Sequence, residues 1–116
     1  MLRLLKATLN SWNGLRAAAR SEQAFREELV ALIVAVPAAF VIATDTWRRV
    51  VLIGVIVLLM IVELLNTAIE KLADRVTRDT DPLIKRVKDM GSAAIFLSLI
   101  AAGVTWIWIV GKRFWF

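Results

Sequence analysis

Four polar residues lie on one stripe of an apolar stretch in the middle of the chain. Glu63, Asn66, Glu70 and Asp74 are spaced i, i+3, i+7 and i+11 within residues 62–74. Residues three and four apart are neighbours on a helix, so the spacing predicts that all four share one face. Residues 50–62 carry no charge, and ionisable groups inside such a segment are costly and usually functional. For Glu70 and Asp74, a solvated helix end explains the pattern as well.

Carboxylates are the default acid–base groups of this chain, because the sequence contains no His, Cys or Tyr. Mg²⁺ prefers carboxylate oxygens and usually binds together with phosphates. Lys and Arg side chains stabilise a phosphoryl group during its transfer. Polar residues in three segments (3–28, 63–74 and 88–92) supply these types and are expected to meet. Together they indicate phosphoryl transfer to a lipid hydroxyl, although neither a Walker loop nor a kinase Gly-rich loop is present.

Composition predicts an all-α membrane protein that forms a single domain. The 116 residues are 59% hydrophobic with a net charge of +5, and the mean hydropathy is +0.71. We expect three transmembrane helices, at about 25–44, 48–70 and 88–110. The uncharged part of the first, residues 29–44, spans only about 24 Å, whereas residues 50–69 span about 30 Å.

The pattern of residues 2–12 predicts an amphipathic helix, which forms part of a longer surface helix expected at about 2–20. Leu2, Leu5, Leu9 and Trp12 share one face, as in helices that lie in the membrane interface. Packing of that face on the same protein is the alternative, and the two are compatible. Gly14 is expected to break the helix.

Four further signals mark helix boundaries and contacts. Asp45 is expected to cap the second membrane helix, and Pro37 to distort the first. Asp81 followed by Pro82 is a strong start signal for the last helix. Gly91, with Ala93 and Ala94, would permit close helix packing.

The Lys and Arg distribution predicts the orientation. The N-terminal region and the loop after the second membrane segment together carry eleven of these residues, against four on the opposite side. The N-terminus is therefore expected in the cytoplasm and the C-terminus outside. Glu63 would then lie about 10 Å below the cytoplasmic edge of the membrane.

The sequence resembles the prokaryotic diacylglycerol kinase family over nearly its whole length. The motifs that carry the resemblance are Ser-Trp-Asn-Gly-Leu-Arg-Ala-Ala at 11–18, Glu-Gln-Ala-Phe-Arg-Glu-Glu at 22–28, Val-Glu-Leu-Leu-Asn-Thr-Ala-Ile-Glu at 62–70, Asp-Arg at 74–75 and Lys-Asp-Met-Gly-Ser-Ala-Ala at 88–94. The resemblance implies a homotrimer in the bacterial inner membrane, with active sites shared between subunits. It also implies transfer of the ATP γ-phosphoryl group, with Mg²⁺, to diacylglycerol, which gives phosphatidic acid.

The resemblance also implies roles for individual residues. Glu63 matches the catalytic base, and Glu22 and Glu70 match the metal ligands. The implied nucleotide-binding residues are Arg3, Asn10, Glu22, Glu70, Lys88 and Asp89. The implied substrate-binding residues are Arg3, Ser11, Trp12, Arg16, Arg26, Glu28, Glu63, Asn66 and Ser92.

Three other functions remain open from the sequence. An undecaprenol kinase would differ from a diacylglycerol kinase only in its lipid alcohol. A small oligomeric transporter could use Glu63 as a proton or cation site, although such sites usually lie near the membrane midplane. A membrane scaffold would not require Glu22, Glu70, Lys88 and Asp89 to converge.

Overall fold

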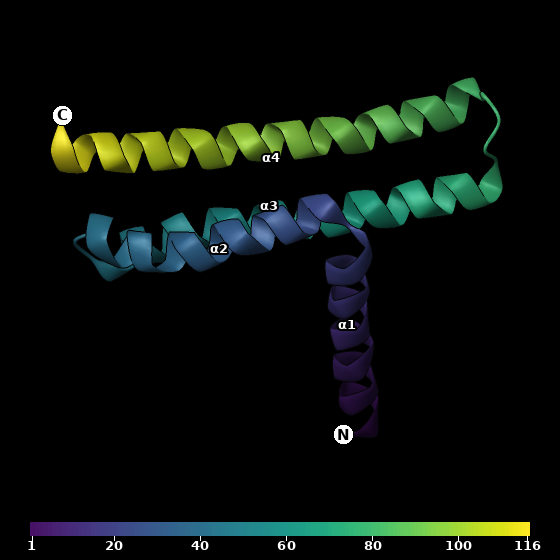
Figure 1. Cartoon of the computed structure of the whole chain (residues 1–116), viewed down its shortest axis with the longest axis horizontal. Helices are drawn as coiled ribbons and strands as arrows, with labels where there is room; N and C mark the ends of the chain where they lie inside the picture. Colours follow the sequence, from purple (N-terminus) through teal and green to yellow (C-terminus); the bar gives the residue numbers. More distant parts are fainter.

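The computed structural model describes residues 1–116 as four helices without strands, which confirms the all-α prediction. The helices are α1 (Leu2–Ser21), α2 (Gln23–Ile42), α3 (Thr46–Val76) and α4 (Pro82–Phe114). Helix α3 contacts both α2 and α4, whereas α2 and α4 contact each other little. The axes of α2, α3 and α4 run in similar directions, and α1 stands across them (Figure 1).

Two helices, α3 and α4, are long and apolar enough to cross a membrane. Their 31 and 33 residues correspond to about 46 and 50 Å. Helix α2 has 20 residues and carries Arg26, Glu27 and Glu28 in its first turns. Its uncharged part, residues 29–42, reaches only about 21 Å, which is less than a hydrocarbon core of about 30 Å. The crossing expected at 25–44 therefore stays a prediction.

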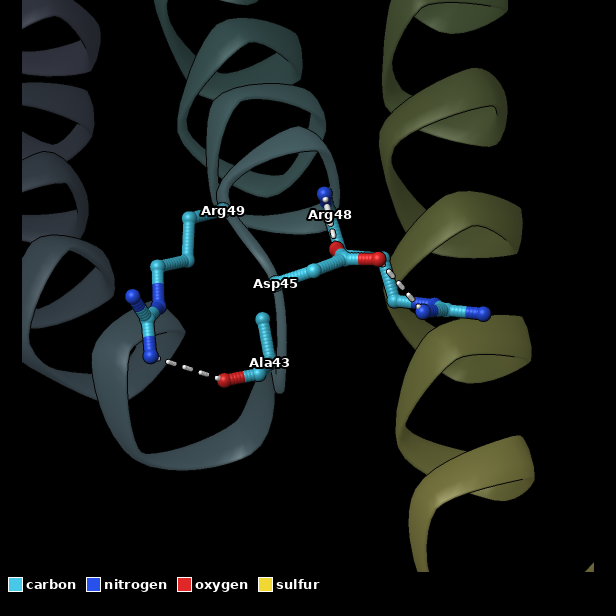
Figure 2. Close-up of polar contacts among 4 residues, drawn as sticks. All are labelled: Ala43, Asp45, Arg48 and Arg49. Carbon is cyan, nitrogen blue, oxygen red and sulfur yellow. Dashed lines mark hydrogen bonds and ion pairs between the residues drawn. The ribbon is translucent and has the colours of Figure 1, made fainter.

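The turn between α2 and α3 is held by its own polar side chains, as Figure 2 shows. Asp45 accepts a hydrogen bond from the Arg48 backbone N–H at 2.8 Å and pairs with Arg48 Nη1 at 2.8 Å. Arg49 Nη2 donates to the Ala43 carbonyl at 3.3 Å, and its guanidinium lies 4.9 Å from the centre of the Phe40 ring. The capping role predicted for Asp45 is confirmed, and the turn reverses the chain within three residues.

The start of α4 also follows the sequence signal. Asp81 Oδ1 accepts hydrogen bonds from the backbone N–H groups of Leu83 at 2.9 Å and Ile84 at 3.1 Å. Pro82 occupies the first helical position, where its missing N–H is not needed. The predicted helix start is confirmed.

Helix α1 does not break at Gly14, so that prediction is wrong. The helix is continuous from Leu2 to Ser21, and nothing contacts the space that a Cβ of Gly14 would occupy. A single glycine lowers helix stability by only about 1 kcal/mol, and the alanines at 17–19 are strong helix formers. Helix α2 likewise continues through Pro37.

The apolar side of α1 does not pack on its own bundle. Leu2, Leu5, Leu9 and Trp12 are all more than half exposed, and Ala18 is the one buried residue of the helix. Packing of residues 2–12 on the same chain is therefore excluded by the structure. Their apolar face requires a lipid surface or another subunit.

A small apolar core lies at the α2–α3 turn. It comprises Ala39, Ala43 and Leu52, with Trp106 packed against it. Trp106 Nε1 donates to the Leu52 carbonyl at 3.1 Å and so ties α4 to α3. Only 14 of the 116 residues are buried, which is far too few for an isolated soluble protein. The outward apolar surface fits a membrane protein.

Near the other end of the bundle, α3 and α4 approach closely at Gly91. A Cβ at this position would collide with Asn66 Oδ1 of α3. Asn66 is itself 6% exposed, and its Oδ1 is buried without a hydrogen-bond partner. The small residue expected to permit helix packing therefore acts within one chain, against a residue of the polar stripe.

We expect Gly91→Ala to lower the melting temperature of the purified protein in detergent. The added methyl group overfills the contact with Asn66, which costs about 1–3 kcal/mol in packed interiors. Gly103→Ala is the matched control, because nothing lies within 4 Å of its Cβ position. The control should be neutral or stabilising, since Ala favours helix over Gly. Equal stabilisation of both variants would contradict the close contact at Gly91.

Candidate active site

The polar stripe of α3 forms a connected network. Glu63, Asn66 and Thr67 are 8%, 6% and 8% exposed. Thr67 Oγ1 donates to Glu63 Oε1 at 3.5 Å, and Asn66 Nδ2 donates to Glu70 Oε1 at 3.1 Å. Both bonds join residues four apart, as the helical spacing predicts. Glu63 is therefore oriented from its own helix, while Glu70 reaches the surface.

Two carboxylates near the start of α2 join those of α3. Glu22 occupies the N-cap position of α2, at the junction with α1, without a side-chain capping hydrogen bond. It lies within electrostatic range of Glu63, as does Glu70. Glu28 is also within electrostatic range of Glu63, and its Oε1 is buried without a hydrogen-bond partner. We call Glu22, Glu28, Glu63 and Glu70 the carboxylate cluster. Repulsion between Glu63 and the other three makes a bound cation favourable there.

A groove of about 740 Å³ separates α1 from α3 beside the cluster. Its polar lining includes Ser11 and Glu22 from the N-terminal region and Thr67 and Lys71 from α3. The rest of the lining is mostly small, with Gly14, Ala17 and Ala18 on α1. The groove can therefore hold a ligand whose polar group faces Glu22 and Lys71.

Lys88 joins α4 to the end of the stripe. Its Nζ lies 2.6 Å from Asp74 Oδ1, and both side chains are partly exposed. Asp74 lies in the charged last turns of α3, beyond the membrane segment expected at 48–70. The hydrogen bond from Lys88 lowers the pKa of the Asp74 carboxyl below its usual value. Asp89 pairs instead with Lys85, at 2.7 Å on the exposed side of α4.

The other residues expected at the site do not contact the cluster within one chain. Arg26 donates to the carbonyls of Ala19 at 3.1 Å and Arg20 at 3.0 Å, and so closes the end of α1. Ser92 is exposed next to Gly91. The remaining four, all exposed on α1, are Arg3, Asn10, Trp12 and Arg16.

Thr67, Lys71 and Asp74 are not among the site residues predicted from the sequence. Thr67 lies four residues after Glu63 and Lys71 four after Thr67, so helical spacing alone would have found both. Asp74 was recognised as part of the stripe. Its partner Lys88 lies fourteen residues further on, and only the α3–α4 packing brings the two together.

The fold and the carboxylate cluster define a small helical membrane protein with an acidic site near one end of its bundle. The model of the family described as prokaryotic diacylglycerol kinase matches residues 9–110. A protein named diacylglycerol kinase from Escherichia coli (strain K12) is 46% identical over 112 residues, which cover 97% of this chain and 92% of the relative. Relatives of the same name from Pseudomonas aeruginosa and Haemophilus influenzae are 45% and 34% identical, over 93% and 89% of this chain and 88% and 87% of their own lengths. The chain belongs to the prokaryotic diacylglycerol kinase family.

The Asp74–Lys88 pair predicts a pH dependence of stability. A carboxyl whose pKa is lower in the folded state stabilises the fold above its unfolded pKa of about 3.9, and this contribution disappears as pH falls through the folded pKa. Asp74→Asn should therefore be less stable than the wild type at pH 7, and the difference should shrink below about pH 4. Melting temperatures of both proteins between pH 3 and pH 7 test this. A difference that is constant with pH would contradict the ion pair.

Proposed function

We propose that this protein is a membrane lipid kinase that transfers the γ-phosphoryl group of ATP to the hydroxyl of diacylglycerol and so produces phosphatidic acid. Membership of the prokaryotic diacylglycerol kinase family supports the reaction. The observation that carries its assignment to this site is Glu63, a buried carboxylate on an apolar helix beside an open groove.

Glu63 is suited to act as the general base. Its carboxylate would take the proton of the lipid hydroxyl while the hydroxyl oxygen attacks the γ-phosphorus, and ADP would leave with the electrons of the broken P–O bond. Thr67 holds Glu63 through the hydrogen bond at 3.5 Å. Because Glu63 is 8% exposed, bulk water has little access to compete with the lipid alcohol.

The nucleotide phosphates would bind nearer the surface, beside Glu22, Glu70 and Lys71. Glu22 and Lys71 line the groove, and Glu70 is exposed on the same face of α3 as Glu63. Lys71 is placed to neutralise phosphate charge. Lys88 is held by Asp74 on the neighbouring side of α3. Lys88 could therefore contact the nucleotide only if this ion pair opened; otherwise it would act on the phosphates at longer range, through its positive charge.

The residues present fit Mg²⁺ bound together with a nucleotide. No group of three potential ligand residues forms a closed metal site. Mg²⁺ usually takes only one or two carboxylates from the protein and completes its shell with water and phosphate oxygens. Glu22 and Glu70 supply two such carboxylates, and the ion would offset the charge of the phosphates there.

We further propose that the protein acts as a homotrimer in the bacterial inner membrane, with the N-terminus and the carboxylate cluster on the cytoplasmic side. Helix α1 extends away from its own bundle (Figure 1), and its apolar face is exposed. Arg3, Asn10, Trp12 and Arg16 could therefore complete the site of a neighbouring subunit. The Lys and Arg distribution supports the orientation.

Turnover with labelled ATP tests the function and the role of Glu63 together. Wild-type protein in detergent should transfer label to diacylglycerol and only weakly to undecaprenol. Glu63→Gln keeps the size of the side chain but cannot accept the proton, so kcat should fall by roughly 10²–10⁴ while ATP affinity changes little.

Glu27→Gln is the matched control for this experiment. Glu27 lies next to Glu28 but is exposed and hydrogen-bonded to Gln23. Turnover by the Glu27→Gln variant should therefore remain near that of the wild type. Faster transfer to undecaprenol would assign the other lipid alcohol. Near-normal turnover of Glu63→Gln would remove Glu63 from the chemical step.

The proposed metal ligands predict a changed magnesium response. Glu22→Gln and Glu70→Gln each remove one charged oxygen ligand, so half-maximal activity should require a higher Mg²⁺ concentration in either variant. Melting temperatures should show that the fold is retained. Titration of activity against Mg²⁺ at fixed ATP checks this, and an unchanged midpoint in both variants would contradict shared ligation.

A further inference from the structure

A second polar cavity lies at the end of the bundle opposite the carboxylate cluster. Its volume is about 190 Å³, and its lining comes from α2, α3 and α4 and from the turn between α2 and α3. Ile42 ends α2 and Thr44 lies in the turn, Arg48 begins α3, and Ile109, Lys112 and Arg113 belong to the end of α4. We call it the basic pocket, because three of its six lining residues are cations.

The charges around the basic pocket are only partly balanced. Asp45 pairs with Arg48 at 2.8 Å, and no other acidic side chain lies in the turn or in the last turns of α4. Lys112 and Arg113 form no ion pair within the chain. Their contacts are with aromatic rings, Lys112 over Trp108 at 5.1 Å and Arg113 over Phe114 at 5.3 Å. The pocket therefore retains an excess of about two positive charges, counted as three cations and one carboxylate.

Of the two arginines that follow the α2–α3 turn, only Arg48 lines the basic pocket. Figure 2 shows Arg48 extending toward α4 and Arg49 extending to the other side of the turn. Arg49 is engaged with the Ala43 carbonyl and the Phe40 ring. Arg48 therefore lines the same pocket as Lys112 and Arg113 of α4.

The position of the basic pocket matches the level of lipid headgroups. Trp108 lies in the last turns of α4 and Trp115 directly follows the helix, and Trp residues gather at membrane–water interfaces. Cations are disfavoured on the side of a membrane that faces away from the cytoplasm. Three of them converging on one cavity at the predicted outer end therefore suggest a ligand.

We propose that the basic pocket binds the phosphate of an anionic phospholipid, which joins the α2–α3 turn to the end of α4. The phosphate would contact Arg48, Lys112 and Arg113, with Thr44 as an additional hydroxyl donor. The acyl chains would lie along the exposed apolar sides of the helices. The site is remote from the carboxylate cluster, so its role is to hold the outer end of the bundle together, independently of catalysis.

The test measures lipid binding by the intact protein in a non-ionic detergent. Phosphatidylglycerol is titrated into the wild type and into the Arg48→Gln/Lys112→Gln/Arg113→Gln variant, with melting temperature and bound lipid per chain by native mass spectrometry as readouts. Each cation near an anionic lipid contributes about a fivefold change in affinity, so the triple variant should bind about 100-fold more weakly. If the triple variant fails to fold, Arg113→Gln alone should bind about fivefold more weakly.

Three controls decide between ligands. Arg20→Gln/Arg75→Gln/Arg86→Gln removes the same charge at the other end of the molecule and should bind phosphatidylglycerol as the wild type does. Phosphatidylcholine should stabilise the wild type less, and inorganic phosphate at equal concentration should not reproduce the shift. Equal binding by the wild type and the pocket variant, equal loss in the control variant, or a full shift with phosphatidylcholine or inorganic phosphate would each overturn the proposal.

Discussion

The structure depends on holding the carboxylate of Glu63 inside an otherwise apolar helix. An ionisable group at that depth needs hydrogen bonds and nearby polar partners. On α3, Thr67 donates to Glu63, and Asn66 lies on the same stripe and donates to Glu70. Asn66 in turn lies against Gly91 of α4, where an added Cβ would meet its Oδ1 unless the Asn66 side chain shifted. The close α3–α4 approach and the chemistry therefore share one contact.

The same constraint explains how the two ends of the bundle differ. At the α2–α3 turn, Ala39, Ala43 and Leu52 form an apolar core that Trp106 closes through its bond to the Leu52 carbonyl. At the cluster end, Glu22, Glu28 and Glu70 each lie within electrostatic range of Glu63, and this repulsion counteracts part of the stabilisation from helix packing there. The stable end can anchor the helices while the acidic end stays open beside the α1–α3 groove. Such a division allows a site to be adaptable without loss of the fold.

Much of this arrangement was readable from the sequence because it depends on local rules. Helical spacing placed Glu63, Asn66 and Glu70 on one face, and Asp45 and Asp81 marked the starts of α3 and α4 by capping. The helix break predicted at Gly14 was wrong because a helix tolerates one glycine at a small cost in stability. The Asp74–Lys88 pair and the contact of Gly91 with Asn66 could not be derived, since both depend on the register between α3 and α4. The proposed homotrimer would place the exposed α1 residues beside a neighbouring subunit, a contact that helical spacing within one chain does not predict.

The orientation of α1 determines where the groove beside the carboxylate cluster opens. A phosphoryl donor is water-soluble and the acceptor stays in the bilayer, so a catalytic site must lie where both can reach it. Helix α1 stands across the bundle (Figure 1) and ends at Glu22, which lines the groove with Lys71. If the apolar face of α1 lies in the interface, the groove opens at headgroup level, with Glu63 deeper along α3 and Glu70 nearer the water. Glu63 and Glu70 are i and i+7, about 10 Å apart along the axis. In the proposed mechanism, this spacing places the proton acceptor on the membrane side of the site and the nucleotide phosphates on the water side.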